Sequence, residues 1–169
     1  MPISTKLEAA FNDQINLELA SSYAYLQMAA FLDEENLPGM SAWMRLQAEE
    51  ERVHAMKFFD FVLDREGHIE LEAIAAPGLS LTTARSAFEA SLGHEQKVTA
   101  AINNLYALAT DDRDFASYPL LNWFVEEQIE EEANVGLIVE QLKMIGDDRT
   151  ALLMLDRELG ARQPSAEGE

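Results

Sequence analysis

The chain has 169 residues, of which 48% are hydrophobic and 25% charged, so it is long enough for one domain with a substantial core. Its formal net charge of −19 argues against nucleic acid as a partner, because binding of phosphate groups requires a basic surface. It contains no cysteine, which excludes disulfides, thiolate metal sites and cysteine nucleophiles.

Residues 4–34 are predicted to form a long helix, with a possible capping box between Thr5 and Glu8. Positions spaced 4,3,4,3,4,3 along it form the seam of a packed helix: Phe11, Ile15, Glu18, Ser22, Tyr25, Ala29 and Leu32. This seam is apolar at its ends and polar in its middle. There Glu18 and Tyr25 lie on one face, two turns apart.

A second helix is predicted over residues 39–66, after a break at Asn36–Gly39. Its seam has the same spacing: Met40, Met44, Gln47, Glu51, His54, Phe58 and Phe61. Glu51 and His54 are three residues apart, so a carboxylate and an imidazole share one face and could bind a divalent transition metal. On its own, a glutamate three residues before a histidine more often belongs to a solvated helical turn. Within an apolar seam, however, a buried carboxylate requires a partner for its charge.

Residues 68–80 lack a helical period and could run the length of a bundle as a crossover. The third helix is predicted over 82–110, and Glu95 is the only charged residue in its seam. The fourth is predicted over 115–145, with Gln128 and Glu131 at the polar break of its seam and Pro119 confined to its first turn. A short fifth helix is expected over 150–159, followed by a frayed polar tail over 161–169.

These elements predict an all-α protein, a four-helix bundle with one long crossover and a short fifth helix, in a single domain over residues 1–169. No apolar run is long enough to cross a bilayer, and the first residues lack the apolar core of a secretion signal. We therefore expect a cytoplasmic protein without a membrane partner.

Four helices thus each carry a seam that is broken near its midpoint by residues of the kind that bind metals. Four carboxylates, one imidazole and one amide at matching depth suit two oxygen-seeking ions such as iron. Glu51 is the natural bridge between the two ions. His54 would complete one ion, and Glu95 with Glu131 the other. The alternative, four solvated polar faces, does not explain why the breaks coincide.

A second acidic cluster lies beside the first. Glu127 and Glu130 flank Gln128, and Glu50 precedes Glu51. If the second and fourth helices face each other, these carboxylates could hold a weaker third metal. An ordinary acidic surface explains their spacing equally well.

With these residues the chain resembles the bacterial non-haem ferritins, and the resemblance extends from Leu7 to about Leu159. The resemblance rests on four motifs: Asn16-Leu17-Glu18-Leu19, Glu50-Glu51-Arg52-Val53-His54, His94-Glu95-Gln96 and Glu127-Gln128-Ile129-Glu130-Glu131. It implies a ferritin-like bundle and a hollow shell of twenty-four subunits. It also implies a ferroxidase that oxidises Fe(II) with dioxygen and an iron-storage protein that holds the ferric mineral.

The resemblance assigns a role to each site residue. The first iron position corresponds to Glu18, Glu51 and His54, and the second to Glu51, Glu95 and Glu131. Gln128 corresponds to the residue beside dioxygen, and Tyr25 to a tyrosine that hydrogen-bonds the site and can be oxidised during turnover. A third iron position corresponds to Glu50, Glu127 and Glu130.

Two departures from related patterns matter. Bacterioferritins place a haem-ligating Met after the bridging Glu, where this chain has Arg52, so we expect no haem. They also carry E-x-x-H where this chain has Gln128 and Glu131. The acidic pair that lines the threefold pore of animal ferritins falls on Tyr118 and Leu121, which leaves the route of iron into the shell open.

Three other functions are compatible with parts of this pattern. A di-iron enzyme acting on an organic substrate would need a substrate cavity, and a rubrerythrin-type peroxidase would bring cysteine ligands that this chain lacks. A bundle that buffers iron without oxidising it would not need Tyr25 and Gln128 beside a complete pair of metal positions. A purely structural bundle should bind no metal tightly.

Overall fold

The computed structural model describes residues 2–164, and every regular element in this range is helical. The elements are α1 (Thr5–Glu34), α2 (Pro38–Asp64), α3 (Ala84–Asp111), the 3-10 turn η1 (Phe115–Ser117), α4 (Tyr118–Ile145) and α5 (Arg149–Leu159). Residues 165–169 of the predicted polar tail lie outside the described range. Within that range no helix is sufficiently long and apolar to cross a membrane.

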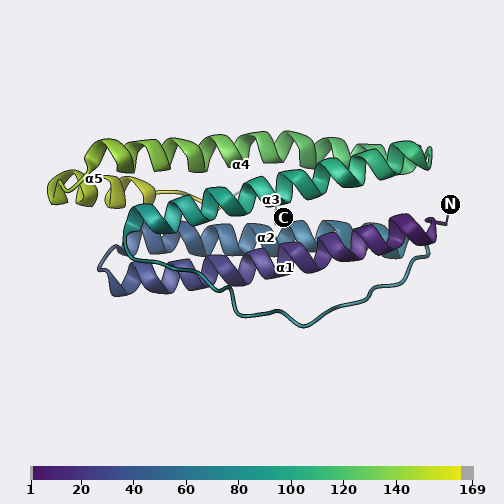
Figure 1. Ribbon diagram of the computed structural model, residues 1–169, viewed down its shortest axis with the longest axis horizontal. Helices are drawn as coiled ribbons and strands as arrows, with labels where there is room; N and C mark the ends of the chain where they lie inside the picture. The colour runs from purple at the N-terminus through teal and green to yellow at the C-terminus, as the bar shows by residue number, and fades with distance from the viewer. Residues whose placement is uncertain (1, 165–169) are drawn as a thin grey trace.

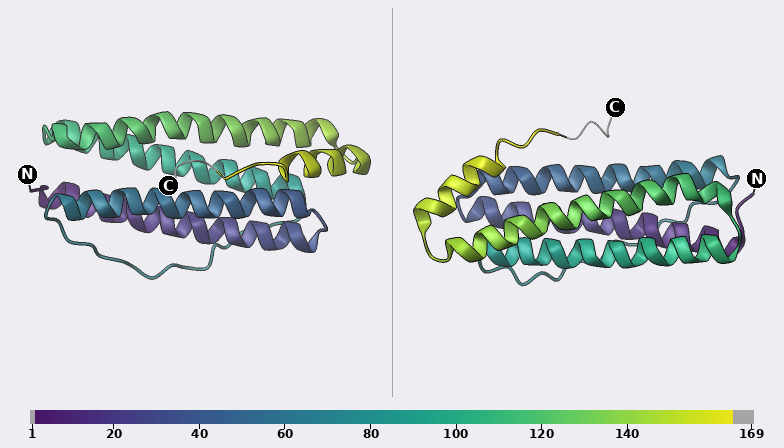
Figure 2. Two further views of the ribbon diagram at one scale, coloured as in Figure 1. Left: turned by 180° about the vertical axis from the view of Figure 1, so that it is seen from behind. Right: turned by 90° about the horizontal axis from the view of Figure 1, so that it is seen from above.

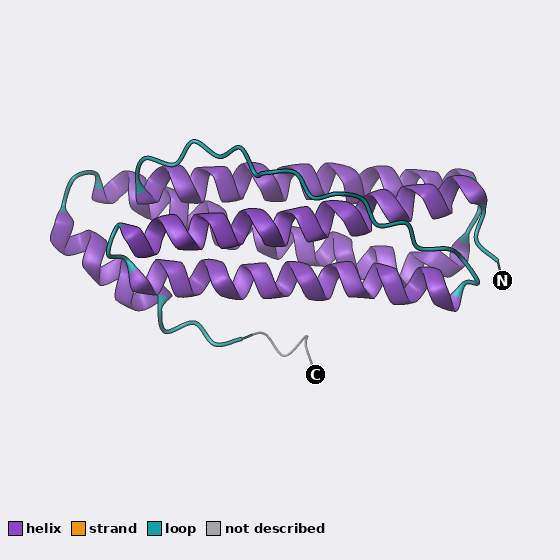
Figure 3. Ribbon diagram, turned by 90° about the horizontal axis from the view of Figure 1, so that it is seen from below, coloured by secondary structure: helices purple, strands orange, loops and turns teal. Residues whose placement is uncertain are grey.

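The four long helices form one elongated bundle (Figure 1). The helix α1 packs against α2 and α3, and α3 packs against α4. The connection over residues 65–83 runs the length of the bundle (Figure 3), so α3 begins at the end of the bundle where α2 also begins. This confirms the predicted all-α bundle with one long crossover and a short fifth helix.

The core is divided into two apolar clusters along the bundle axis. One lies toward α5 and includes Met28, Met40 and Phe88. The other lies toward the start of α1 and includes Phe11 and Phe58. Between the clusters all four long helices contribute buried polar side chains: Glu18, Gln47, Glu51, His54, Ser91, Glu95, Gln128 and Glu131. Apolar burial on both sides therefore supports a polar middle that would not be stable alone.

The helix ends differ in detail from the sequence expectations. Ser4, rather than Thr5, caps α1, and its Oγ accepts from the backbone N–H of Leu7 at 3.2 Å. The helix α3 begins with a capping box between Thr83 and Ser86. Pro119 lies in the first turn of α4, where its missing N–H leaves no helical hydrogen bond unmade.

The N-terminus of α2 is capped by a distant helix. Its own capping position is Leu37, which has no side-chain acceptor. Asp156 of α5 supplies one, because its Oδ1 accepts from the backbone N–H of Met40 at 2.8 Å. Gly39 permits this contact, since a Cβ there would lie 1.8 Å from the backbone oxygen of Asp156. Thus α5 is fixed across the start of α2.

The crossover is held on α1 by two asparagine side chains. Asn12 donates to the carbonyl of His68 at 2.9 Å and accepts from the N–H of Glu70 at 2.7 Å. Asn16 does the same one turn later, with the carbonyl of Glu70 and the N–H of Glu72, each at 2.9 Å. The amides satisfy backbone groups of an extended segment much as a neighbouring strand would.

Candidate metal centre

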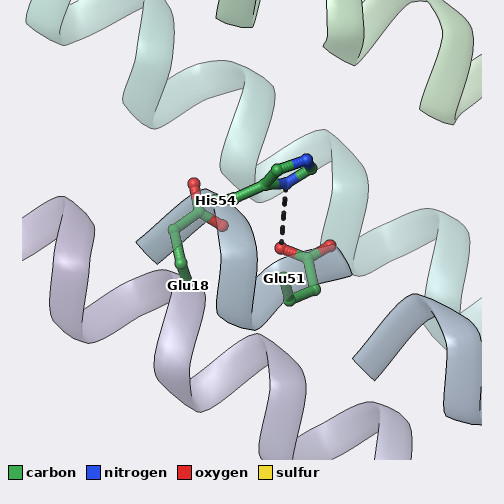
Figure 4. Close-up of side chains that lie close together, drawn as sticks. All are labelled: Glu18, Glu51 and His54. Carbon is green, nitrogen blue, oxygen red and sulfur yellow. Dashed lines mark ion pairs between the residues drawn. The ribbon is translucent and has the colours of Figure 1, made fainter. Parts of the chain in front are cut away.

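Three metal-type side chains converge in the polar middle of the bundle (Figure 4). Glu18 extends from α1 toward Glu51 and His54 of α2, and one ligand atom from each lies within 4.8 Å of the others. His54 Nδ1 lies 3.7 Å from Glu51 Oε2. The three residues are 0–1% exposed. The i, i+3 spacing on one helix and a carboxylate from its antiparallel neighbour create this convergence.

These buried side chains are better explained as ligands of a metal ion than as part of a purely structural core. Glu18 Oε2 and Glu51 Oε2 are buried and have no hydrogen-bond partner. A buried carboxylate oxygen without a hydrogen bond is costly, and a cation between the two oxygens would remove that cost. Among residues 2–164, no second group of three Asp, Glu or His side chains converges in this way.

The third helix brings Glu95 to the same region, together with Tyr25 of α1. The Tyr25 hydroxyl donates to Glu95 Oε1 and also hydrogen-bonds with Ser91 Oγ at 2.9 Å. Gln128 of α4 donates through Nε2 to Glu95 Oε2 at 3.3 Å. Glu95 is therefore oriented by a phenol on one side and an amide on the other.

The fourth helix contributes Glu131. Gln47 of α2 donates through Nε2 to Glu131 Oε2 at 2.9 Å, which orients this carboxylate across the seam between α2 and α4. The Cα atoms of these two helices stay more than 8 Å apart, so long polar side chains span the space between them. Glu131 is 5% exposed.

The four carboxylates perturb one another's protonation. Burial, with repulsion from Glu51, raises the pKa of Glu18 well above its usual value. Burial and the charges of Glu95 and Glu131 do the same to the pKa of Glu51. Burial, Glu95 and Glu50 raise the pKa of Glu131 to about 8. Burial and the charge of Glu95 raise the pKa of Tyr25. A bound cation would oppose each of these shifts, since it favours the ionised form.

The structure brings only some of the predicted metal ligands into direct contact. Glu18, Glu51 and His54 meet directly, whereas Glu95 and Glu131 lie outside this group of three and raise the pKa of Glu51 by their charges. The residues of the expected third cluster differ in burial: Glu50 is buried, Glu127 half-buried and Glu130 exposed, and the structure does not bring the three together as a converging group.

Sequence reasoning missed four residues that support the centre. Gln47 orients Glu131, Ser91 contacts Tyr25, and Thr99 accepts from Gln128 at 3.3 Å. Arg162 contacts Gln47 and Glu50 from the segment beyond α5. Gln47 lies in the polar break of its seam, which was a usable signal. Neither Thr99 nor Arg162 has one.

A cavity of about 380 Å³ between α3 and α4 reaches this region. Gln128 forms part of its wall, together with Thr99 and Glu132. Since Gln128 Nε2 also contacts Glu95, the amide lies between the cavity and the Glu95 carboxylate. A small molecule that moved from the cavity toward Glu95 would therefore pass Gln128.

A four-helix bundle with one long crossover and inward-facing carboxylates has the architecture of the ferritin-like carboxylate proteins. A family model for the ferritin-like domain matches residues 8–145. The chain is 40% identical to the bacterial non-heme ferritin of Staphylococcus aureus over an alignment of 160 residues. The alignment covers 95% of this chain and 96% of that protein. This chain belongs to the ferritin family, as the sequence motifs predicted.

Solved structures agree with this assignment. The open-pore ferritin of the hyperthermophilic archaeon Archaeoglobus fulgidus superposes with a TM-score of 0.93 at 48% identity, over 95% of this chain and 98% of that one. A closed form of the same ferritin, engineered by mutagenesis, gives a TM-score of 0.94 at 47% identity, over 96% and 99% of the two chains.

Proposed function

We propose that this protein stores iron, and that it oxidises Fe(II) with dioxygen at a pair of iron positions inside each subunit. The observation that carries the proposal is the convergence of Glu18, Glu51 and His54, with two buried carboxylate oxygens that no hydrogen bond satisfies. Membership of the ferritin family supports iron as the metal.

The first iron would bind Glu18, Glu51 and His54, and the second Glu51, Glu95 and Glu131. Sharing Glu51 holds the two ions close enough for both to react with one dioxygen molecule. Each Fe(II) loses one electron, so the pair reduces dioxygen by two electrons, and two protons complete a peroxide-level product. Buried, raised-pKa carboxylates would release their own protons when Fe(II) binds.

Tyr25 and Gln128 would act beside the metals rather than as ligands. The Tyr25 hydroxyl donates to Glu95, which fixes the orientation of that carboxylate and places a phenol next to the second iron position. Gln128 lies between Glu95 and the cavity, so its amide would meet an approaching dioxygen. We assign both residues to the oxidation step on this geometry.

A third iron position is proposed at Glu50, Glu127 and Glu130, next to Glu131. Their range from buried to exposed suits a weaker site that passes iron between the pair and the interior of the shell. The absence of haem remains an expectation, which the name of the non-heme relatives supports. The cytoplasmic location also stays a prediction.

Iron loading without air, followed by exposure to air, tests the proposal. The protein should bind two Fe(II) tightly in each subunit and then consume about one dioxygen for each pair within seconds, followed by slower mineral growth. Binding without oxygen uptake would indicate a buffer. An absence of tight binding would indicate a structural bundle. Either result would exclude the proposed oxidation.

A further inference from the structure

Beyond α5, the described residues 160–164 turn back along α2 (Figure 2). Within this segment, Arg162 contacts Gln47 and Glu50 of α2. Its Nη2 donates to Glu50 Oε2 at 2.6 Å, and its Nη1 donates to Gln47 Oε1. The guanidinium carbon lies 4.8 Å from the centre of the Trp43 ring. The sequence expectation of a frayed tail is therefore wrong for Arg162.

These contacts form a partly buried binding site for one positively charged group. The side chain of Glu50 is 10% exposed and that of Arg162 24%, so water screens their attraction only partly. Trp43 is 5% exposed and presents its ring to the cation. Three different groups, a carboxylate, an amide oxygen and an indole ring, each favour a cation at this point.

The same contacts continue to the paired site. Gln47 accepts from Arg162 through its oxygen and donates to Glu131 through its nitrogen, so its two ends cannot exchange without losing both hydrogen bonds. By binding the amide oxygen of Gln47, Arg162 keeps the amide nitrogen directed at Glu131. The guanidinium is two hydrogen bonds away from a residue assigned to the second iron position.

We propose that Arg162 is an internal counter-ion for the third cation position, so that a metal bound at Glu50 must displace the guanidinium. A metal ion at Glu50 would share one carboxylate with the guanidinium, and repulsion between these two positive charges would favour release of the guanidinium. The C-terminal segment would then be held on α2 while the position is empty and released when it is filled. The inference rests on the third position given under the proposed function, but it concerns a residue that the function did not require.

Competition makes the affinity of the third position the first readout. Replacing Arg162 by Ala removes the competitor and should tighten the third ion about tenfold, the equivalent of one charge-assisted hydrogen bond. Arg162→Lys keeps the positive charge but lacks the guanidinium that donates to Gln47 and Glu50 together, so its effect should be smaller. Arg157→Ala is the matched control, because this exposed arginine of α5 carries the same charge.

The probe is Zn(II), which is redox-inert and so separates binding from oxidation. Calorimetric titration of the assembled wild-type protein and the three variants would give the affinity of each ion. Crystals soaked in Zn(II) would identify the ion at Glu50, Glu127 and Glu130. Wild-type crystals with that ion bound should show Arg162 withdrawn from Glu50.

Movement of the segment is the second readout, and a general charge effect would not produce it. Because the chain contains no cysteine, Gln163→Cys provides a single attachment point for a spin label on an exposed residue. The label should stay restrained while the paired site fills and become mobile when the third ion binds. In an Arg162→Ala background it should be mobile from the start.

The outcomes separate this inference from the proposed function. Equal third-ion affinity in wild type and Arg162→Ala, or a label that stays restrained at saturation, would overturn the inference. So would a full paired site with no third ion in either protein, although the paired-site function would then stand. Failure of Zn(II) to occupy Glu18, Glu51 and His54 would count against the proposed function, while the affinity at Glu50 would still decide the role of Arg162.

Discussion

Glu51 is the residue on which the proposed centre depends most. It lies with Glu18 and His54 in the buried convergence, and the charges of Glu95 and Glu131 both act on it. Glu51→Ala should therefore reduce the initial rate of Fe(II) oxidation by at least about 100-fold, because loss of residues that merely orient ligands already costs 10–100-fold. Stopped-flow measurement of oxidation would check this.

Glu49→Ala is the control for that experiment. Glu49 is exposed on the same helix and pairs with Arg52 at the surface, so its removal changes the charge equally without reaching the centre. Its oxidation rate should match that of the wild type. An undiminished rate in Glu51→Ala would show that the residues are assigned to the wrong site.

The raised pKa values also predict how pH affects the metal-free protein. An unfolded glutamate has a pKa near the usual 4.5, whereas folding raises the pKa of Glu131 to about 8. Between these values the folded state keeps a proton that the unfolded state has lost. The stabilising contribution is present below pH 4.5 and is lost as pH rises toward 8, by about 1.4 kcal/mol per pH unit for such a group.

The thermal midpoint with chelator present should therefore fall between pH 6 and pH 8. Glu131→Gln should make this decline shallower, because the amide does not titrate. Glu126→Gln, on an exposed face of the same helix, should leave the slope unchanged. If Glu131→Gln and Glu126→Gln gave the same slope as the wild type, the raised pKa attributed to Glu131 would be wrong.

At the level of elements, the attachment of α5 depends on a capping contact across the chain. Asp156 accepts from the N–H of Met40, and the helix it caps has no side-chain cap of its own. Asp156→Ala should lower the free energy of unfolding by about 1 kcal/mol, as loss of a helix cap commonly does. It should also increase hydrogen exchange in α5 and free the segment that carries Arg162.

Glu158→Ala is the matched control, since Glu158 is an exposed carboxylate on the same helix. Gly39→Ala offers an independent approach: its Cβ would meet the backbone of Asp156, so α5 must shift. Unchanged hydrogen exchange in α5 for both Asp156→Ala and Gly39→Ala would mean that other contacts hold this helix.

Helical periodicity predicted the helices and singled out the residues proposed for the metal centre, for one physical reason. A seam that packs must be apolar, so Glu18, Glu51 and Glu95 stood out where the seams are interrupted. Contacts between segments distant in sequence leave no such signal. Asn12 and Asn16 look like ordinary surface amides, yet they anchor the crossover.

The residues off the seams were harder to interpret. Trp43, like Tyr23, Leu26, Phe31 and Phe59, lies off or at the edge of the seam of its helix, and the sequence alone favours contacts between subunits for such large side chains. Trp43 instead packs inside the subunit, 5.3 Å from Phe88 between ring centres, with Arg162 over its ring. Spacing along one helix could not show that a segment more than a hundred residues later would return to cover it.

For the whole molecule, apolar side chains on the outside of the subunit favour assembly. Tyr23 and Leu26 lie three residues apart on α1, and each is 49% exposed. Leu153 and Met154 are also exposed on α5. Such groups are costly to leave in water where they form patches, and contact with other copies would remove that cost.

The exposed apolar groups predict assembly, and the resemblance to bacterial non-haem ferritins sets the expectation of a closed shell of twenty-four copies in native solution, with a mass far above the 18.9 kDa of one chain. The net charge of −19 on each copy opposes this assembly, so added salt should shift the population toward the shell by screening the repulsion. Leu26→Glu, which adds charge to an exposed apolar position, should require more salt to assemble. Glu49→Gln, which removes charge from an exposed position, should not. Native mass spectrometry and light scattering at micromolar concentration would measure both effects. A species near 19 kDa at every salt concentration would rule out the shell.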